Sequence, residues 1–364
     1  MTPTPDGPGS PTRLPRWVTR PLSGLYRAEI GRRNRRYDRG VGVAALDRPV
    51  VSVGNLSAGG TGKTPVVRWV VGVLRSAGHR PVVAMRGYGA PPGGVSDEER
   101  EHRDAMPGVP VVARPDRTAA LREHFASGPG AADDCVVLDD GFQHRRLARD
   151  LDIVLIDASK PPDRDRLLPE GFLREPPESL ARAGAVVITH AELVSASELE
   201  HVQDFVRALV RDGVPVAAAE HRWSGLRVVR SGERAQDDAG APPTEPVGWL
   251  GGRRVVAVCA IGHPRGFFDA VDRSGAVRVG ERVLPDHDPF REAIVEQMVC
   301  LAENARAEAV VLTAKDWAKL ADRRIAWPCP VVIPTLDIGF VSGECGLADR
   351  VTAAVADHDP RRGG

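Results

Sequence analysis

The chain has 364 residues, a formal net charge of zero and a pI near 7.2. This length allows two domains with substantial cores, and the neutral charge balance gives no global sign of nucleic-acid binding. Five scattered cysteines without C-x-x-C spacing argue against a disulfide framework or a zinc site and favour a reducing cytoplasm. No apolar run reaches about 18 residues and no signal-peptide pattern is present, so no spanning helix is expected.

The N-terminal region changes character at position 13. Residues 1–12 are rich in Pro, Thr, Gly and Ser and are predicted to form a disordered tail. Residues 13–45 are predicted to form a basic amphipathic segment, in which nine arginines face only Glu29 and Asp38. The apolar side chains at helical spacing are Leu22, Leu25, Tyr26 and Ile30. Such a helix either lies on an anionic membrane surface or packs on the following domain, and the residues leave both open.

A glycine-rich loop between a predicted strand at 49–54 and a predicted helix at 64–77 is the clearest functional motif. Its glycines let successive amides point at phosphate oxygens, and the following helix N-terminus adds positive character. We therefore predict a nucleotide-phosphate site formed by Ser57, Ala58, Gly59, Gly60, Thr61, Gly62, Lys63 and Thr64.

Two side chains of this loop have distinct expected roles. Lys63 is expected to reach the β- and γ-phosphates, and the Thr64 hydroxyl is expected to ligate Mg²⁺. Ser57 departs from the motif G-x-x-x-x-G-K-[ST], which has glycine there. The alternative is a glycine-rich turn without a ligand, but the flanking strand and helix favour the nucleotide site.

Strands and helices then alternate, and the strands are near-continuous Val, Ile and Leu runs, as in a parallel sheet buried on both faces. We predict an α/β fold, with a P-loop-containing doubly wound parallel-sheet domain over 46–225 and a second, smaller α/β domain over 226–333. Within the second domain, 231–252 is predicted to be a loop or linker. The other predicted strands lie at 82–86, 135–138, 153–157, 185–189, 214–219, 254–260, 276–283, 309–313 and 330–333. The other predicted helices lie near 117–127, 196–211, 266–272, 291–307 and 315–321.

The predicted strand at 135–138 ends in two acids, Asp139 and Asp140. After a phosphate loop this arrangement resembles a Walker B element, in which a carboxylate holds Mg²⁺ directly or through water. Because neighbouring side chains of a strand point to opposite faces, one of the two carboxylates suffices. The alternative is an acidic turn. Gln143 and His144 follow and are candidates for orienting water, phosphate or substrate.

Two further polar stretches allow two interpretations each. A kinase acting on a hydroxyl needs a carboxylate near that nucleophile, and Asp97 and Glu98 offer one. Their composition alone indicates a helix start in which Ser96 caps the amide of Glu99. Residues 285–289, Pro-Asp-His-Asp-Pro, are either part of a site or a solvated polar turn.

Several segments, taken in order, resemble the tetraacyldisaccharide 4′-kinases of lipid A biosynthesis. The specific part is the D-D-G-x-Q-H run from Asp139 to His144 after a phosphate loop that, as in the family, lacks the first Walker glycine. The corroborating segments span roughly 49 to 320 and lie at 53–56, 62–65, 86–89, 149–150, 167–169, 171, 173–175, 262, 267–268, 285–287, 313 and 315–316.

The resemblance implies transfer of the ATP γ-phosphate, with Mg²⁺, to the 4′-hydroxyl of tetraacyldisaccharide 1-phosphate, giving lipid IVA. It implies that Asp97 is the catalytic base or orients the hydroxyl, that His287 tunes it across the domain cleft, and that Lys63 is the third catalytic residue. The implied metal-holding residues are Thr64, Asp139 and Asp140. The implied substrate-contacting residues are Arg174, Glu175, Gln143 and His144.

The implied partners are the acylated disaccharide lipid and the inner-membrane surface, on its cytoplasmic face and as a peripheral protein, with no nucleic acid or protein partner inferred. Since the family's domains are joined by a two-stranded linker, 334–364 is expected to pack back on the first domain. Two rival functions stay open. One is a P-loop kinase or ligase of a soluble metabolite. The other is a membrane-surface nucleotide switch ATPase, a class that usually has a lysine where this chain has Ala58.

Overall fold

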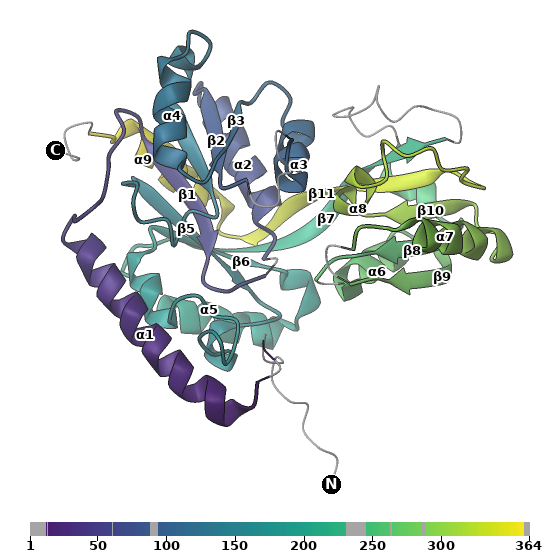
Figure 1. The fold of residues 1–364 in the computed structure, drawn as a ribbon, viewed down its shortest axis with the longest axis horizontal. Coiled ribbons are helices and arrows are strands. Elements are labelled where there is room, and N and C mark those ends of the chain that lie inside the picture. Colours follow the sequence, from purple (N-terminus) through teal and green to yellow (C-terminus); the bar gives the residue numbers. More distant parts are fainter. Residues whose placement is uncertain are drawn as a thin grey trace. The chain divides into compact units, whose positions relative to one another are not determined.

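The computed structural model describes residues 12, 14–59, 61–87, 94–230, 245–262, 264–285 and 288–359 (Figure 1). Gly60, His287 and the side chain of Asp97 lie outside the described residues. So do residues 1–11 of the predicted tail and residues 231–244 of the predicted linker.

The chain divides into two compact units. The first contains Met1–Arg86, Val109–His221 and Ile338–Gly364, and the second contains Gly87–Gly108 and Arg222–Asp337. The predicted continuous domain over 46–225 is thereby corrected, because residues 87–108 belong to the second unit. The physical reason is that α3 (Asp97–Ala105) packs on α8 (Ala314–Ala318), and Arg100 pairs with Asp322 at 3.3 Å.

A parallel sheet forms the centre of the first unit, with the strand order β3-β2-β4-β1-β5-β6-β7. Val50 of β1 lies opposite Val136 of β4, and Val51 of β1 lies opposite Leu151 of β5. Every residue of β1 is buried, as its apolar run predicts. The strands are β1 (Val50–Asn55), β2 (Pro81–Met85), β3 (Val111–Ala113), β4 (Cys135–Asp139), β5 (Leu151–Asp157), β6 (Ala185–Thr189) and β7 (Val216–Val229).

Helices cover this sheet and bury its apolar side chains. Leu121 of α4 packs with Val136 of β4, and Val202 of α5 packs with Val154 of β5. The α2 and α9 helices pack against each other and against β1. The predicted P-loop α/β fold with a parallel sheet is confirmed. These helices are α2 (Lys63–Ser76), α4 (Arg117–Ala126), α5 (Ala196–Arg207) and α9 (Glu344–Ala356).

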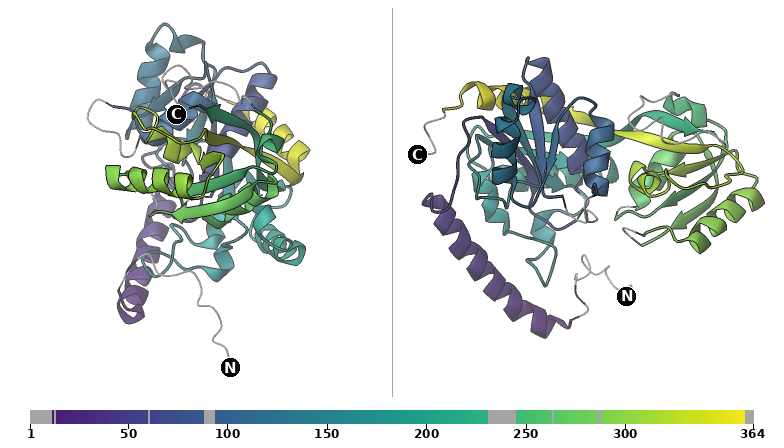
Figure 2. Two further views of the ribbon diagram at one scale, coloured as in Figure 1. Left: turned by 90° about the vertical axis from the view of Figure 1, so that its right-hand side faces the viewer. Right: turned by 45° about the horizontal axis from the view of Figure 1, so that its top comes forward.

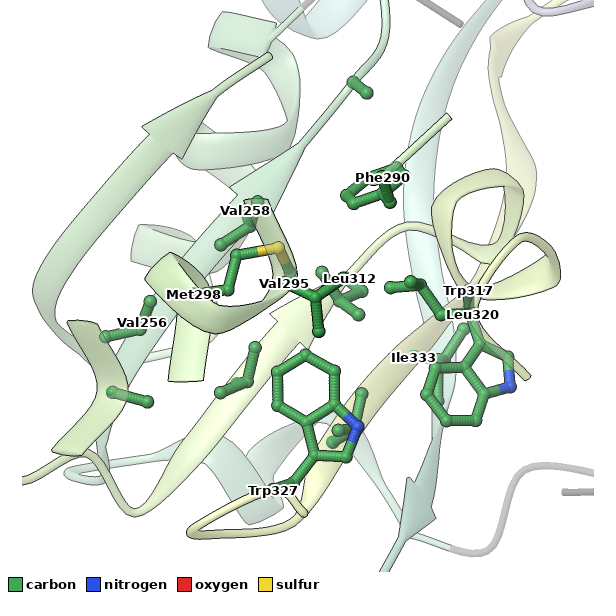
Figure 3. Close-up of a cluster of buried hydrophobic side chains, with 14 of the residues drawn as sticks. Val256, Val258, Phe290, Val295, Met298, Leu312, Trp317, Leu320, Trp327 and Ile333 are labelled. Atoms are coloured by element: carbon green, nitrogen blue, oxygen red, sulfur yellow. The ribbon is translucent and has the colours of Figure 1, made fainter. Parts of the chain in front are cut away.

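The second unit is a smaller α/β layer structure, with the strand order β7-β11-β10-β8-β9. Figure 3 shows its core, in which Met298 and Leu312 lie beside the large ring of Trp327. These side chains are at most 8% exposed. Its further strands are β8 (Arg254–Cys259), β9 (Val277–Val283), β10 (Ala309–Leu312) and β11 (Val331–Ser342), and its further helices are α6 (Pro264–Arg273) and α7 (Glu292–Asn304).

The strands β7 and β11 are much longer than the predicted strands at 214–219 and 330–333. Each runs from one unit into the other, since β7 passes the boundary after His221 and β11 passes it before Ile338 (Figure 1). Their extensions are polar and weakly patterned, so they gave no strand signal.

Helix α1 (Arg16–Asp38) runs along the outside of the first unit (Figure 2). It packs there with small and polar side chains. The Ser23 hydroxyl donates to the Leu167 carbonyl at 3.0 Å, and the Tyr26 hydroxyl donates to the Arg174 carbonyl at 3.0 Å. The helix therefore packs on the domain, but not through the predicted apolar face, and the predicted membrane contact stays a prediction.

The apolar side of α1 does not follow the predicted face. Ile30 is buried, but Leu22 is 41%, Leu25 is 69% and Trp17 is 79% exposed. The helix therefore turns large apolar side chains outward although it packs on the unit. Among the described residues, no helix combines the length and apolar character needed to cross a membrane.

Candidate functional site

The phosphate loop leaves the carboxyl end of β1, the edge at which parallel α/β sheets bind ligands. Its first turn is held by a neighbouring segment rather than by a glycine at position 57. The Ala58 amide donates to the Phe172 carbonyl, and the Arg174 amide donates to the Leu56 carbonyl, both at 2.7 Å. Ser57 therefore sits in a short antiparallel bridge with Leu173, where a side chain is accommodated.

The second half of the loop is fixed by side chains from two strand ends. Asn55 donates to the Thr61 hydroxyl at 2.9 Å, and the Thr189 hydroxyl donates to the Thr61 carbonyl at 3.0 Å. Gly62 then begins α2 with a φ of 70°, a left-handed conformation that favours glycine. These bonds place the N-terminus of α2 at the site, with its unpaired amides available to an anion.

Lys63, Asp140 and Arg174 form a charge cluster. The Lys63 ammonium lies 3.4 Å from Asp140 Oδ1, and Arg174 contacts the two oxygens of Asp140 at 3.1 and 2.9 Å. Burial opposes ionisation of Asp140, but the charges of Lys63 and Arg174 outweigh it and hold the pKa of this carboxyl below its ordinary value. The cluster joins the phosphate loop to the end of β4 and brings together three predicted site residues.

Asp139, the last residue of β4, is only 7% exposed. The buried side chain of Arg117 donates to the carbonyls of Asp139 and Asp140 at 3.0 and 3.1 Å, so it fixes the turn that aims both acids. Carboxylate and hydroxyl oxygens are the ligands that Mg²⁺ prefers, and Asp139, Asp140 and Thr64 supply such a donor set. Sequence analysis missed Arg117, because a single arginine at a helix start carries no local signal.

Gln143 and His144 follow these acids after Gly141 and Phe142. Gln143 donates to the Asn55 carbonyl at 2.9 Å, and therefore braces the end of β1. Burial and the neighbouring charges of Arg117 and Arg149 lower the pKa of His144 to about 4. The imidazole of His144 is therefore neutral at physiological pH.

Glu175 requires a correction. Its carboxylate is completely buried, receives 3.0 and 3.3 Å contacts from Arg182, and accepts a 2.7 Å hydrogen bond from Asn34 of α1. We therefore do not retain Glu175 as a substrate-contacting residue, because no part of it reaches the surface. It anchors the segment that presents Arg174.

Two motifs of the second unit have visible structural roles. The predicted cap is confirmed, since the Glu99 amide donates to the Ser96 hydroxyl at 3.2 Å and α3 begins at Asp97. The Asp316 carboxylate is fully buried and accepts hydrogen bonds from the Thr313 hydroxyl at 2.7 Å and the Ala260 amide at 3.0 Å. It ties α8 to the end of β8.

The backbone of Asp97 belongs to the second unit, as do the described segments on either side of His287. Since His287 lies outside the described residues, the expected tuning of Asp97 by His287 across the domain cleft stays a prediction.

Three features together define a P-loop nucleotide-binding protein. They are a parallel α/β sheet, a glycine loop at a helix N-terminus, and paired acids at the end of β4, the strand beside β1 in the sheet. The family model of the tetraacyldisaccharide-1-P 4′-kinases, LpxK, matches residues 15–342. The chain belongs to this family.

Known proteins similar to this chain carry the same description. The tetraacyldisaccharide 4′-kinase of Anaeromyxobacter dehalogenans strain 2CP-C is 38% identical over 312 residues, which are 81% of this chain and 79% of that protein. The protein of the same description from Chlorobaculum parvum is 34% identical over 333 residues, 85% of this chain and 86% of that one. Among solved structures, LpxK from Aquifex aeolicus in complex with ATP has a TM-score of 0.69 and 27% identity, covering 92% of this chain and 98% of that one.

Proposed function

We propose that this chain transfers the γ-phosphate of ATP to the 4′-hydroxyl of tetraacyldisaccharide 1-phosphate, which gives lipid IVA. The observation that carries the proposal is the phosphate loop joined to Asp140 through Lys63, in a chain whose family match covers 15–342. The loop amides and Lys63 would bind the triphosphate and stabilise the charge that develops during transfer.

Lys63 and Arg174 occupy the carboxylate oxygens of Asp140, so we assign the metal-holding role to Asp139 together with Thr64. When bound there, Mg²⁺ supplies positive charge to the phosphate oxygens. Arg174 is the candidate for a substrate phosphate, because its side chain is 30% exposed beside the loop. Asp97 would accept the proton of the sugar hydroxyl, with His287 tuning it.

The proposed substrate is a lipid, which places the reaction at a membrane surface. The support in this chain is α1, whose arginine-rich sequence carries the exposed side chains Trp17 and Leu25. We propose peripheral binding of this helix to the cytoplasmic face of the inner membrane.

A phosphate-transfer assay tests the reaction. Purified protein in mixed micelles with labelled ATP and the disaccharide 1-phosphate lipid should give labelled lipid, and Asp97→Ala should lose this transfer. Asp269→Ala, which removes an exposed carboxylate on α6 of the same unit, is the matched control and should retain it.

The rival functions give different results in the same assay. Phosphorylation of soluble sugar alcohols without detergent would favour a metabolite kinase. Steady ATP turnover without any acceptor would favour a nucleotide switch. A correctly folded wild-type protein that transfers no phosphate to the lipid contradicts the proposal.

A further inference from the structure

The imidazole of His221, in β7, packs against Gly62 of the phosphate loop. A Cβ atom on Gly62 would lie 2.2 Å from Nε2 and 2.3 Å from Cε1 of His221, so the ring fills the space beside this glycine. Gly62 is the residue at which the loop becomes helix α2. The ring therefore contacts the loop where its backbone reverses into the left-handed conformation.

A second histidine and two acids surround His221. The ring centroids of His190 and His221 are 4.4 Å apart, with an angle of 36° between the planes. Nδ1 of His190 lies 3.2 Å from Asp157 Oδ1, and the His221 amide donates to Glu192 Oε2 at 3.1 Å. All four side chains are between 4% and 12% exposed. They form a buried polar stack that ends on Gly62.

The stack is anchored at its far end and lies at the ligand-binding edge of the sheet. Asp157 accepts hydrogen bonds from the amide and the hydroxyl of Ser159, at 2.9 and 2.7 Å. Asp157 ends β5, and His190 directly follows Thr189 at the end of β6, whose hydroxyl already holds Thr61. Burying two imidazoles and two carboxylates is costly, so such a cluster beside a binding loop points to a functional role.

We propose that His221, supported by His190, is a positioning residue that holds the phosphate loop in the curled form that binds the triphosphate. The loop amides converge on phosphate only in that form, and the ring prevents the loop from relaxing toward β7 at Gly62. This inference rests on the proposed ATP-dependent function. It gives β7, the strand that leaves the first unit directly after His221, a direct contact with the loop.

The test compares wild type, His221→Ala and His221→Phe. Calorimetry measures the Kd of ATP and ADP, and steady-state kinetics measure the KM of ATP and of the lipid acceptor separately. We expect His221→Ala to raise the Kd and KM of ATP roughly tenfold or more, because small displacements of binding groups have large effects. The KM of the lipid should stay unchanged. His221→Phe should remain within about threefold of wild type, because its ring still fills the space beside Gly62.

His201→Ala is the control, since this histidine of α5 is 50% exposed and pairs with Asp163 at 2.9 Å, outside the stack. An unchanged ATP affinity in His221→Ala overturns the inference. So do equal losses in the Ala and Phe variants, or an equal rise of both KM values. If His221→Ala does not fold, the Phe variant and His190→Ala carry the same comparison.

Failure of the inference and failure of the proposed function are distinguishable. A wild-type protein that binds ATP but transfers no phosphate contradicts the lipid-kinase function and leaves the affinity comparison valid. A wild-type protein that transfers phosphate while His221→Ala binds ATP equally well contradicts only the role of His221.

Discussion

The ammonium nitrogen of Lys63 lies 3.4 Å from Oδ1 of Asp140, and Arg174 binds both oxygens of the same carboxylate. One acid thus connects the phosphate loop, the end of β4 and the segment that borders the loop. Because each group carries a full charge in a partly buried setting, removing any one of them changes the charge balance of the site.

Lys63→Ala should lower the kcat of phosphate transfer by on the order of 10² or more, because the lysine stabilises charge that develops on the transferred phosphate. The measurement is labelled-phosphate transfer at saturating ATP. Arg75→Ala, which removes an exposed cation from the end of the same helix, should leave kcat unchanged. Near wild-type turnover by Lys63→Ala would show that another group performs this role.

Asp140 should contribute to stability in a pH-dependent way. Its folded pKa is lowered, so its contribution is fully present above the unfolded pKa of about 3.9 and is lost as the pH falls through the folded pKa. Asp140→Asn should therefore be less stable than wild type at pH 7, and the difference should narrow in acid. Urea unfolding from pH 7 to pH 3 measures this, and a difference independent of pH would contradict it.

His144 should titrate far below an ordinary histidine. Its folded pKa of about 4 lies under the unfolded value of about 6.5, so the unfolded chain binds the proton more readily. The free energy of unfolding should therefore decrease as the pH is lowered from about 6.5 to about 4. An NMR titration of its imidazole protons should show a midpoint near 4, whereas the urea-unfolded chain should show about 6.5. A folded-state midpoint near 6.5 would show that burial and the neighbouring arginines do not lower the pKa of His144.

Two glycine substitutions should have opposite effects. A Cβ on Gly54 would lie 2.6 Å from the Phe142 amide nitrogen, so Gly54→Ala should destabilise the protein by about 1–3 kcal/mol or more through overpacking. For Gly72, in the interior of α2, no atom lies within 4 Å of such a carbon apart from its chain neighbours and the backbone of its own helix. Gly72→Ala should stabilise by up to about 1 kcal/mol. Urea unfolding measures the free energy of unfolding of both variants. Equal changes in the two would contradict the close contact between Gly54 and Phe142.

Removing Arg182 should leave the buried charge of Glu175 with Asn34 as its remaining described hydrogen-bond donor. Arg182→Ala should therefore cost about 3–5 kcal/mol, whereas the double variant Arg182→Ala with Glu175→Gln should lose less. Part of the loss should persist, since Arg182 also stacks on Phe142 at 4.3 Å. Free energies of unfolding for the two single variants and the double variant measure the coupling. Strictly additive losses would show that the pair is not coupled.

Local pattern predicted most elements of the sheet. The β-branched runs at β1, β4 and β6 are buried on both faces, and a strand with that environment must be apolar throughout, so its sequence reveals it. The long strands β7 and β11 were underestimated. Their extensions are polar and carry no alternation that a local window detects.

The residues of the site also fall into two groups, those that a sequence motif reveals and those that only the fold brings together. The motifs that contain Lys63, Thr64, Asp139 and Asp140 have a spacing that reflects phosphate and metal chemistry, so these residues can be recognised from the sequence alone. Thr189 and His221 reach the loop only through the fold, and Arg117 reaches the turn after β4 in the same way, each as a single residue without a motif. The family resemblance implies that Glu175 contacts the substrate, but burial against Arg182 decides otherwise.

The sequence by itself determined the phosphate loop, the paired acids and the α/β class, because each depends on residue types at fixed short spacing. Only the tertiary structure decided that α3 joins the second unit, that Asp140 is the partner of Lys63, and that His221 packs against Gly62. These are contacts between distant segments, and packing and charge pairing across such distances leave no periodic trace in the chain.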